Sequence, residues 1–284
     1  MTFDFSTLYT KIPHNKLLYV LNQLIDFCFK GGDKSYIVVS EWGAKWVNNV
    51  NDHNIWFDKK RIKSAVKYLL DNCFFKVGNF VFRQCIDIPM GSDPAPFFAN
   101  LFLYFYESKW INKIKKESLY RARRFTNTFR FIDDLNAMND CGEFEKCFKD
   151  IYPQELELKK ENNGNKQATF LDLDISVNGN KFEIKLFDKR DAFPFSIVRM
   201  PFYSSNIPSS IFYASIGAET LRICRATTNI DHFTSSVKTF IARMLKQGAI
   251  ESKVDRTLKK SFGRHNSLFV NIASTATNFV KLVL

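Results

Sequence analysis

Apolar residues at helical spacing mark several predicted helices along the chain. Their spacing over 14–28 predicts an amphipathic helix that ends at the glycine-rich segment 31–34. A second helix is expected over 62–70 and a third from about Pro96 to Lys116. From about Ser209 onwards the pattern is helical throughout.

Strand-like runs lie between the earlier helices. They occur at 2–10, 36–40, 45–50, 79–88, 155–160 and 169–188. Asn178 and Gly179 have the residue types of a tight hairpin turn within the last of these runs. This mixture predicts an α+β body over 1–190, followed by a mainly helical region over 191–284.

The segment "TFRFIDDLNAM" over 128–138 places two adjacent aspartates between apolar residues. Its two halves flank Asp133 and Asp134 as the strands of a β-hairpin would. Partly buried carboxylates are unfavourable unless they are hydrogen-bonded, paired or next to a cation. Asp4, at the end of another strand-like stretch, could face them, and three carboxylates can hold two Mg²⁺ ions for phosphoryl transfer. The residues alone leave equal room for a solvated turn.

The segment "QCIDIPMGSDPAPFFANLFL" over 84–103 places Met90, Gly91 and Ser92 before a proline-bounded helix start. Ser92 could cap that helix, and Gly91 would let a flat group approach the backbone closely. Taken by itself, this pattern is also that of an ordinary strand–turn–helix.

The net charge of +12, with a pI of about 9.3, comes from clustered basic residues. Clusters at 59–67, 109–124 and 246–264 favour a polyanionic partner, with nucleic acid ahead of a membrane surface. Each cluster taken singly is equally compatible with a solvated helix face.

Six cysteines and four histidines show no zinc-ligand spacing, which is typical of reduced thiols in an intracellular protein. The chain opens without a signal-peptide pattern. Its most apolar stretch, 94–106, is too short to span a bilayer, so no membrane association is expected.

Three ordered motifs resemble those of reverse transcriptases. They are motif A over 3–13 ("FDFSTLYTKIP"), motif B over 84–103 and motif C over 129–135 ("FRFIDDL"). The resemblance is to the polymerases of Penelope-like retroelements, which are related to telomerase. "FLDLDI", "KLFDKRD" and "SNIPSS…RICRA" are similar to later palm and thumb segments of that family.

The resemblance implies a polymerase palm, an antiparallel sheet with packing helices, followed by a mainly helical thumb. It implies that Asp4 and Asp133 bind two catalytic Mg²⁺ ions, for which Mn²⁺ could substitute, with Asp134 completing the site. Tyr9 would exclude a ribose 2′-hydroxyl, although the residue alone could equally be a core tyrosine. Further substrate contacts are implied for Phe5, Gln84, Met90, Gly91 and Ser92.

The implied activity is RNA-directed DNA polymerisation. The partners would be an RNA template, a DNA primer, the RNA/DNA hybrid and deoxynucleotide triphosphates, and the location would be intracellular, with a nuclear site expected from function. Basic thumb residues would contact the hybrid backbone: Lys246, Lys253, Arg256, Lys259 and Lys260.

Two features depart from the family pattern. Asp87 stands where the family usually has glycine, and the motifs start three residues after Met1. The chain is therefore expected to be the palm-and-thumb piece of a longer polymerase, without the fingers segment that precedes motif A in the family. Two alternatives therefore stay open: a fragment that binds nucleic acid without catalysis, and a two-metal nuclease built on the same carboxylates. Asp172 and Asp174 are expected on a solvated strand face near the primer grip.

Overall fold

A computed structural model describes residues 1–30, 35–51, 54–88, 92–139, 141–162, 164, 166–195 and 197–284. The chain forms two compact units, Met1–Glu161 and Asn162–Leu284, each with its own hydrophobic core. The fold is α+β, as the sequence predicts. None of the helices in the described ranges is long and apolar enough to cross a membrane.

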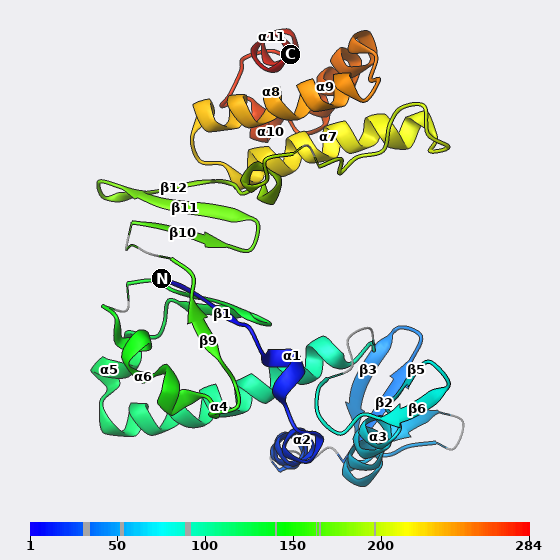
Figure 1. Cartoon of the computed structure of the whole chain (residues 1–284), viewed down its shortest axis with the longest axis vertical. Coiled ribbons are helices and arrows are strands. Elements are labelled where there is room, and N and C mark those ends of the chain that lie inside the picture. The colour runs from blue at the N-terminus through cyan, green and yellow to red at the C-terminus, as the bar shows by residue number, and fades with distance from the viewer. Residues whose placement is uncertain are drawn as a thin grey trace. The chain divides into compact units, whose positions relative to one another are not determined.

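A four-stranded antiparallel sheet organises the first unit (Figure 1). Its order is β7-β8-β1-β9, with β1 at Thr2–Phe5, β7 at Thr128–Phe131, β8 at Asp134–Ala137 and β9 at Leu158–Lys160. Side chains alternate between the faces of a strand. Phe3 and Phe5 of β1 are accordingly buried on one face, and the Phe3 ring meets Phe144 edge-on at 5.0 Å.

Helices cover the buried face of this sheet. The long helix α4 (Ala95–Glu117) packs against α2 (His14–Cys28) and α6 (Glu143–Ile151), which confirms the predicted helices at 14–28 and 96–116. The shorter α1 (Leu8–Lys11), α3 (Lys59–Asp71) and α5 (Leu119–Arg123) complete the unit.

Two small sheets lie between α2 and α4 in the sequence. Strands β2 (Tyr36–Ser40), β3 (Gly43–Val47) and β4 (Ile55–Phe57) pair in the order β3-β2-β4, so the expected hairpin of 36–50 is confirmed. Strands β5 (Phe74–Val77) and β6 (Phe80–Arg83) form a separate hairpin around Gly78. The strand expected over 79–88 thus ends at Arg83.

The second unit combines a meander with a helical bundle. Strands β10 (Gln167–Phe170), β11 (Leu173–Asn178) and β12 (Lys181–Leu186) precede a 3-10 turn, Lys189–Ala192. Gly179 opens the β11–β12 turn with a φ of 59°, in line with the predicted turn. The helices that follow are α7 (Ser209–Ala226), α8 (Ile230–Lys246), α9 (Glu251–Arg264), α10 (Asn266–Phe269) and α11 (Ala276–Val283).

The meander belongs with these helices rather than with the first sheet. Ile184 of β12 exchanges hydrogen bonds with Thr228, whose amide donates to the Ile184 carbonyl at 2.9 Å. The compact units therefore divide at Glu161, earlier than the boundary at 190 expected from the sequence. The assignment of palm and thumb to particular residues stays a prediction.

Candidate active site

The sheet brings the predicted carboxylates of motifs A and C together. Asp4 of β1 pairs directly with Asp134 of β8, and the Phe5 amide donates to the Asp133 carbonyl at 3.1 Å. Directly opposed residues of antiparallel strands share a face, with Cβ atoms about 4.5–5.5 Å apart. Asp4 and Asp134 therefore point to the face of the sheet opposite Phe3 and Phe5, and Asp133 lies in the adjoining turn.

The turn that carries Asp133 is strained. Phe131 and Asp134 are the last paired residues of β7 and β8, so the loop consists of Ile132 and Asp133. Ile132 has a φ of 55°, in the left-handed region that β-branched residues rarely occupy. Such strain costs about 1–3 kcal/mol and occurs preferentially at functional sites.

Arg130, a residue of β7, holds this turn through its guanidinium group. Its guanidinium donates to the Ile132 carbonyl at 3.1 Å and forms a two-pronged ion pair with Glu107 of α4, at 2.6 and 3.1 Å. The Tyr152 hydroxyl donates to the same Glu107 carboxylate at 2.8 Å. Burial, and then the charge of Glu107, raises the pKa of Tyr152 well above its usual value. The strained loop is thereby anchored to the longest helix of the unit.

Tyr9 lies close to this site. Burial, and then the negative charge of Asp133, raises the pKa of the Tyr9 phenol. The backbone of Tyr9 also accepts a hydrogen bond from the Ile88 amide at 2.8 Å, which ties motif A to the segment leading into motif B. The Phe5 ring, by contrast, is a core residue packed edge-on against Tyr152 at 4.8 Å, and the whole residue is buried.

The motif B residues are placed in part. Met90 and Gly91 lie outside the described residues. Gln84 is at the base of the β5–β6 hairpin, where its backbone amide donates to the Cys73 carbonyl at 2.8 Å. The expectation that Ser92 caps the helix is wrong, because α4 begins at Ala95 with Pro94 as its N-cap. The Ser92 carbonyl instead accepts the Ala95 amide.

Asp87 occupies a position that suits glycine. Its φ is 93°, a conformation that glycine adopts more readily than residues with a Cβ. Burial raises the pKa of the Asp87 carboxyl, and the His14 ring bonds to the Asp87 carbonyl at 2.7 Å. An aspartate at this position therefore has a local energetic cost.

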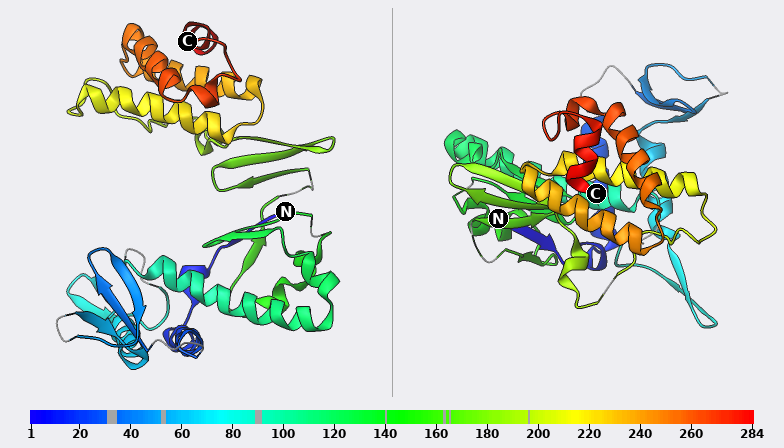
Figure 2. Two further views of the ribbon diagram at one scale, coloured as in Figure 1. Left: turned by 180° about the vertical axis from the view of Figure 1, so that it is seen from behind. Right: turned by 90° about the horizontal axis from the view of Figure 1, so that it is seen from above.

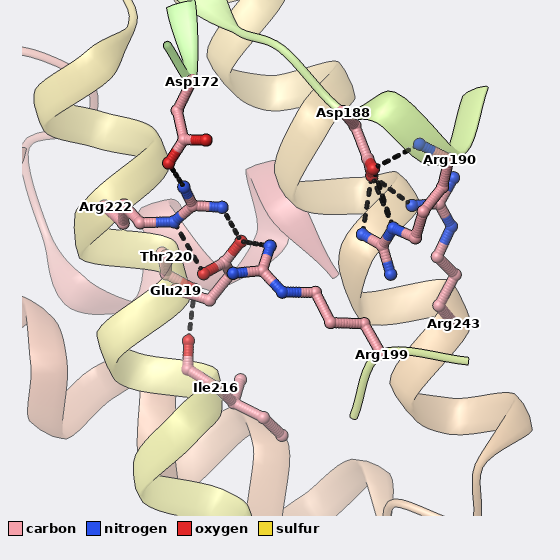
Figure 3. A network of polar contacts seen from close by, with 9 residues as sticks. All are labelled: Asp172, Asp188, Arg190, Arg199, Ile216, Glu219, Thr220, Arg222 and Arg243. Carbon is pink, nitrogen blue, oxygen red and sulfur yellow. Dashed lines mark hydrogen bonds and ion pairs between the residues drawn. The ribbon is translucent and has the colours of Figure 1, made fainter. Parts of the chain in front are cut away.

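A second hairpin of similar design occurs in the other unit. The β10–β11 loop consists of Leu171, also with a φ of 55°, and Asp172. Asp172 accepts a hydrogen bond from Arg222 of α7 at 3.0 Å, and Arg222 also binds Glu219 through both prongs (Figure 3). Asp172 is exposed, as expected.

The expectation for Asp174 is wrong, since this residue is buried. It accepts hydrogen bonds from the Gln167 amide and pairs with Lys185 at 3.3 Å. Beyond the end of β12, Asp188 accepts hydrogen bonds from Arg190 and Arg243 (Figure 3), which hold the pKa of its carboxyl well below its usual range.

The predicted nucleic-acid contacts of the second unit are exposed at the end of α8 and along α9: Lys246, Lys253, Arg256, Lys259 and Lys260. The Lys253 ammonium lies 5.6 and 5.7 Å from the ring centres of Tyr203 and Tyr213, and Lys259 pairs with Asp255 at 3.0 Å. These five side chains form an accessible basic surface.

Two residues of the first site were missed from the sequence. Arg130 has a visible signal, an arginine between two phenylalanines of a strand, but its partner Glu107 can be identified only from the fold. Lys159 of β9 pairs directly with Asp4 on the side away from Asp134, which places a positive charge beside the carboxylates. The alternation of "ELELKK" indicates a strand without indicating its neighbour.

A known structure shares this fold. Telomerase from Candida albicans, solved in complex with a TWJ fragment of telomeric RNA, matches with a TM-score of 0.60 and 12% identity over 99% of this chain and 47% of that chain. Telomerase from Candida tropicalis, also with a TWJ fragment, gives a TM-score of 0.43 and 15% identity over 96% of this chain and 39% of that chain. No family model and no curated protein matches the chain.

The chain therefore has a telomerase-like α+β fold. It spans about half the length of the Candida albicans telomerase chain that it matches.

Proposed function

We propose that the chain is the palm and thumb portion of an RNA-directed DNA polymerase, of the kind found in Penelope-like retroelements. The observation that carries the proposal is the direct pairing of Asp4 with Asp134, beside the strained turn that presents Asp133. The order of motifs A, B and C and the telomerase-like fold support it. A primer, an RNA template and deoxynucleotide triphosphates are the partners proposed, and a nuclear location follows from that role.

The chain's own residues would have distinct tasks in this reaction. Arg130 and Glu107 hold the turn so that Asp133 keeps one position relative to Asp4. Tyr9, next to Asp133, would contact the sugar of the incoming nucleotide and disfavour a 2′-hydroxyl. The exposed basic residues of α9 would bind phosphates of the duplex without reading its sequence.

The donor set fits Mg²⁺, which prefers oxygen ligands and is commonly bound through one or two carboxylates, with water and substrate phosphates as further ligands. Asp4 and Asp133 would be its ligands, with Asp134 beside them. Divalent ions at this position would activate the attacking oxygen and neutralise charge on the leaving phosphate. Among the described residues, no three His, Cys, Asp or Glu side chains lie together so that they could hold a metal ion by themselves. Substrate phosphates would therefore complete the coordination.

The test is extension of a DNA primer on an RNA template with Mg²⁺ or Mn²⁺. The parent chain should extend the primer, Asp4→Asn should abolish extension, and Asp150→Asn, an exposed aspartate of α6, should leave it unchanged. Hybrid binding is measured in parallel by fluorescence anisotropy.

A module that binds nucleic acid without catalysis is the second candidate, because the described carboxylates do not form a complete metal group. Salt-sensitive hybrid binding with no extension by the parent would support that candidate and contradict the polymerase proposal.

A further inference from the structure

The β5–β6 hairpin exposes an aromatic face to solvent. It forms a two-stranded sheet of its own, and all eight of its strand residues are exposed. The register pairs Phe75 with Phe82 and Val77 with Phe80, so these four apolar side chains share one face. Figure 2 shows the hairpin, in cyan, projecting from the first unit.

The three phenylalanine rings on this face form a continuous row. Phe75 and Phe82 are stacked at 5.6 Å, and Phe80 lies 6.4 Å from Phe82. Phe80 is 71% exposed and Phe82 is 46% exposed. A lone two-stranded hairpin is marginally stable in water. This exposed face is therefore expected to be buried by a binding partner when the protein functions.

The charge around the hairpin indicates which class of partner binds to this face. Residues 59–83, which comprise α3 and the hairpin, contain seven basic residues and one acidic residue, Asp71. Asp71 is already paired with Lys67 and Arg83. Within the described ranges Lys60 and Lys76 have no ion-pair partner, and Lys76 lies on the opposite face of the hairpin from the phenylalanine row. Lys59 and Lys63 of α3 pair with Asp26, so the unpaired positive charge of this segment includes Lys60 and Lys76. Unpaired lysines in the same segment as exposed aromatic rings complement a polyanion with flat groups and disfavour a basic protein surface.

The hairpin also leads directly to the candidate active site. Its second strand ends at Arg83, and five residues later the Ile88 amide donates to the Tyr9 carbonyl at 2.8 Å. The hairpin is therefore joined to the candidate active site by a short segment of chain, residues 84–88.

We propose that the β5–β6 hairpin is a stacking platform for single-stranded nucleic acid. Bases lie on Phe75, Phe80 and Phe82, and phosphates of the strand where it passes beyond the edge of the hairpin are bound by the unpaired Lys60 and Lys76. Because every base has a π-face, the platform tolerates any sequence. Identification of this strand as the unpaired template rests on the proposed polymerase function, whereas the binding itself needs none of the carboxylates.

The experiment uses a 15-nucleotide single-stranded RNA with 2-aminopurine at its centre, titrated with the full chain in the absence of nucleotides. Phe80→Ala and Phe82→Ala should each weaken binding about 5- to 150-fold, the range of one base–aromatic stack, and should reduce the change in 2-aminopurine fluorescence. Phe80→Leu keeps the apolar surface but removes the ring, and should weaken binding similarly. Lys76→Ala should lower the salt dependence of binding while the fluorescence change persists.

Phe27→Ala is the matched control, because Phe27 is an exposed ring on α2 of the same unit, and it should leave binding unchanged. Circular dichroism checks that each variant is folded. Unchanged RNA binding by folded Phe80→Ala and Phe82→Ala would overturn the platform. Parent-like RNA binding by Phe80→Leu would do the same, since it would indicate a site for an apolar partner. Primer extension separates the two proposals: its absence from a parent that still stacks RNA rejects only the polymerase, and its presence alongside unchanged variants rejects only the platform.

Discussion

The hairpins β7–β8 and β10–β11 have the same turn and opposite electrostatic surroundings. Each loop pairs an apolar residue at a φ of 55° with an aspartate, Ile132–Asp133 in one and Leu171–Asp172 in the other. Asp172 is held by Arg222 of the next helix. Among the described residues no ion pair reaches Asp133, whose neighbours include the carboxylates of Asp4 and Asp134.

The difference shows that the loop alone does not define a metal site. In the first hairpin the arginine, Arg130, binds the loop carbonyl and leaves the aspartate open. In the second the arginine binds the aspartate itself. One backbone design thus presents a charge in one unit and neutralises it in the other.

The largest expected effect comes from the same substitution in both hairpins. Asp133→Asn should lower primer extension about 100-fold or more, because a charge that would contact metal is lost. Asp172→Asn should stay within about twofold of the parent, because it removes only an exposed surface pair. Steady-state extension rates measure both, and equal losses in the two variants would break the comparison.

The arginines provide a second contrast, in stability. Arg130→Met should lower the free energy of unfolding by about 3 kcal/mol, since it leaves the Glu107 carboxylate without its cation. Arg222→Met should cost about 1 kcal/mol, because Asp172 is exposed and Arg199 lies 3.7 Å from Glu219. Urea unfolding followed by circular dichroism gives both values. A larger loss of unfolding free energy for Arg222→Met than for Arg130→Met would mean that Arg222 makes the more stabilising contacts of the two.

Acid should destabilise the second unit through Asp188. The folded-state pKa of Asp188 is depressed, mainly by its hydrogen bonds with Arg190, so its contribution to stability is present above the unfolded pKa of about 4 and is lost as the pH falls below it. Asp188→Asn should be less stable than the parent at pH 7 and should lose less stability between about pH 4 and pH 2. Thermal melts across that range test the prediction, and parallel curves for parent and variant would contradict it.

The smallest expected effect concerns backbone strain. Leu171→Gly should raise stability by about 0.5–1 kcal/mol, because glycine adopts a positive φ without a Cβ clash and Leu171 is already 39% exposed. Ile132→Gly should give no gain, since Ile132 packs against the core of its unit. Differential scanning calorimetry resolves shifts of this size. An equal gain at both positions would mean that Ile132 contributes little packing.

Local pattern was enough to predict much of the secondary structure, whereas the facing of motifs A and C was implied by the resemblance. Helical spacing located α2 and α4, and the apolar flanks of Asp133 and Asp134 identified the β7–β8 hairpin. Contacts between distant segments were not predictable in this way. The burial of Asp174 depends on Lys185 and Gln167 of neighbouring strands, and the clamp on Ile132 depends on Glu107 of α4. Alternation within one strand carries no information about which strand lies next to it.

The position of β1 within its sheet has a consequence for biosynthesis. This strand is synthesised before both of its partners, yet it lies between β8 and β9, and Met1, which precedes it, bonds with Ala137, 136 residues away. At synthesis rates of about 5–20 residues per second, β1 waits roughly 7–30 s for its first partner. Phe3 and Phe5 remain unburied during that interval, so the nascent chain is expected to need a chaperone until residues 134–160 have left the ribosome.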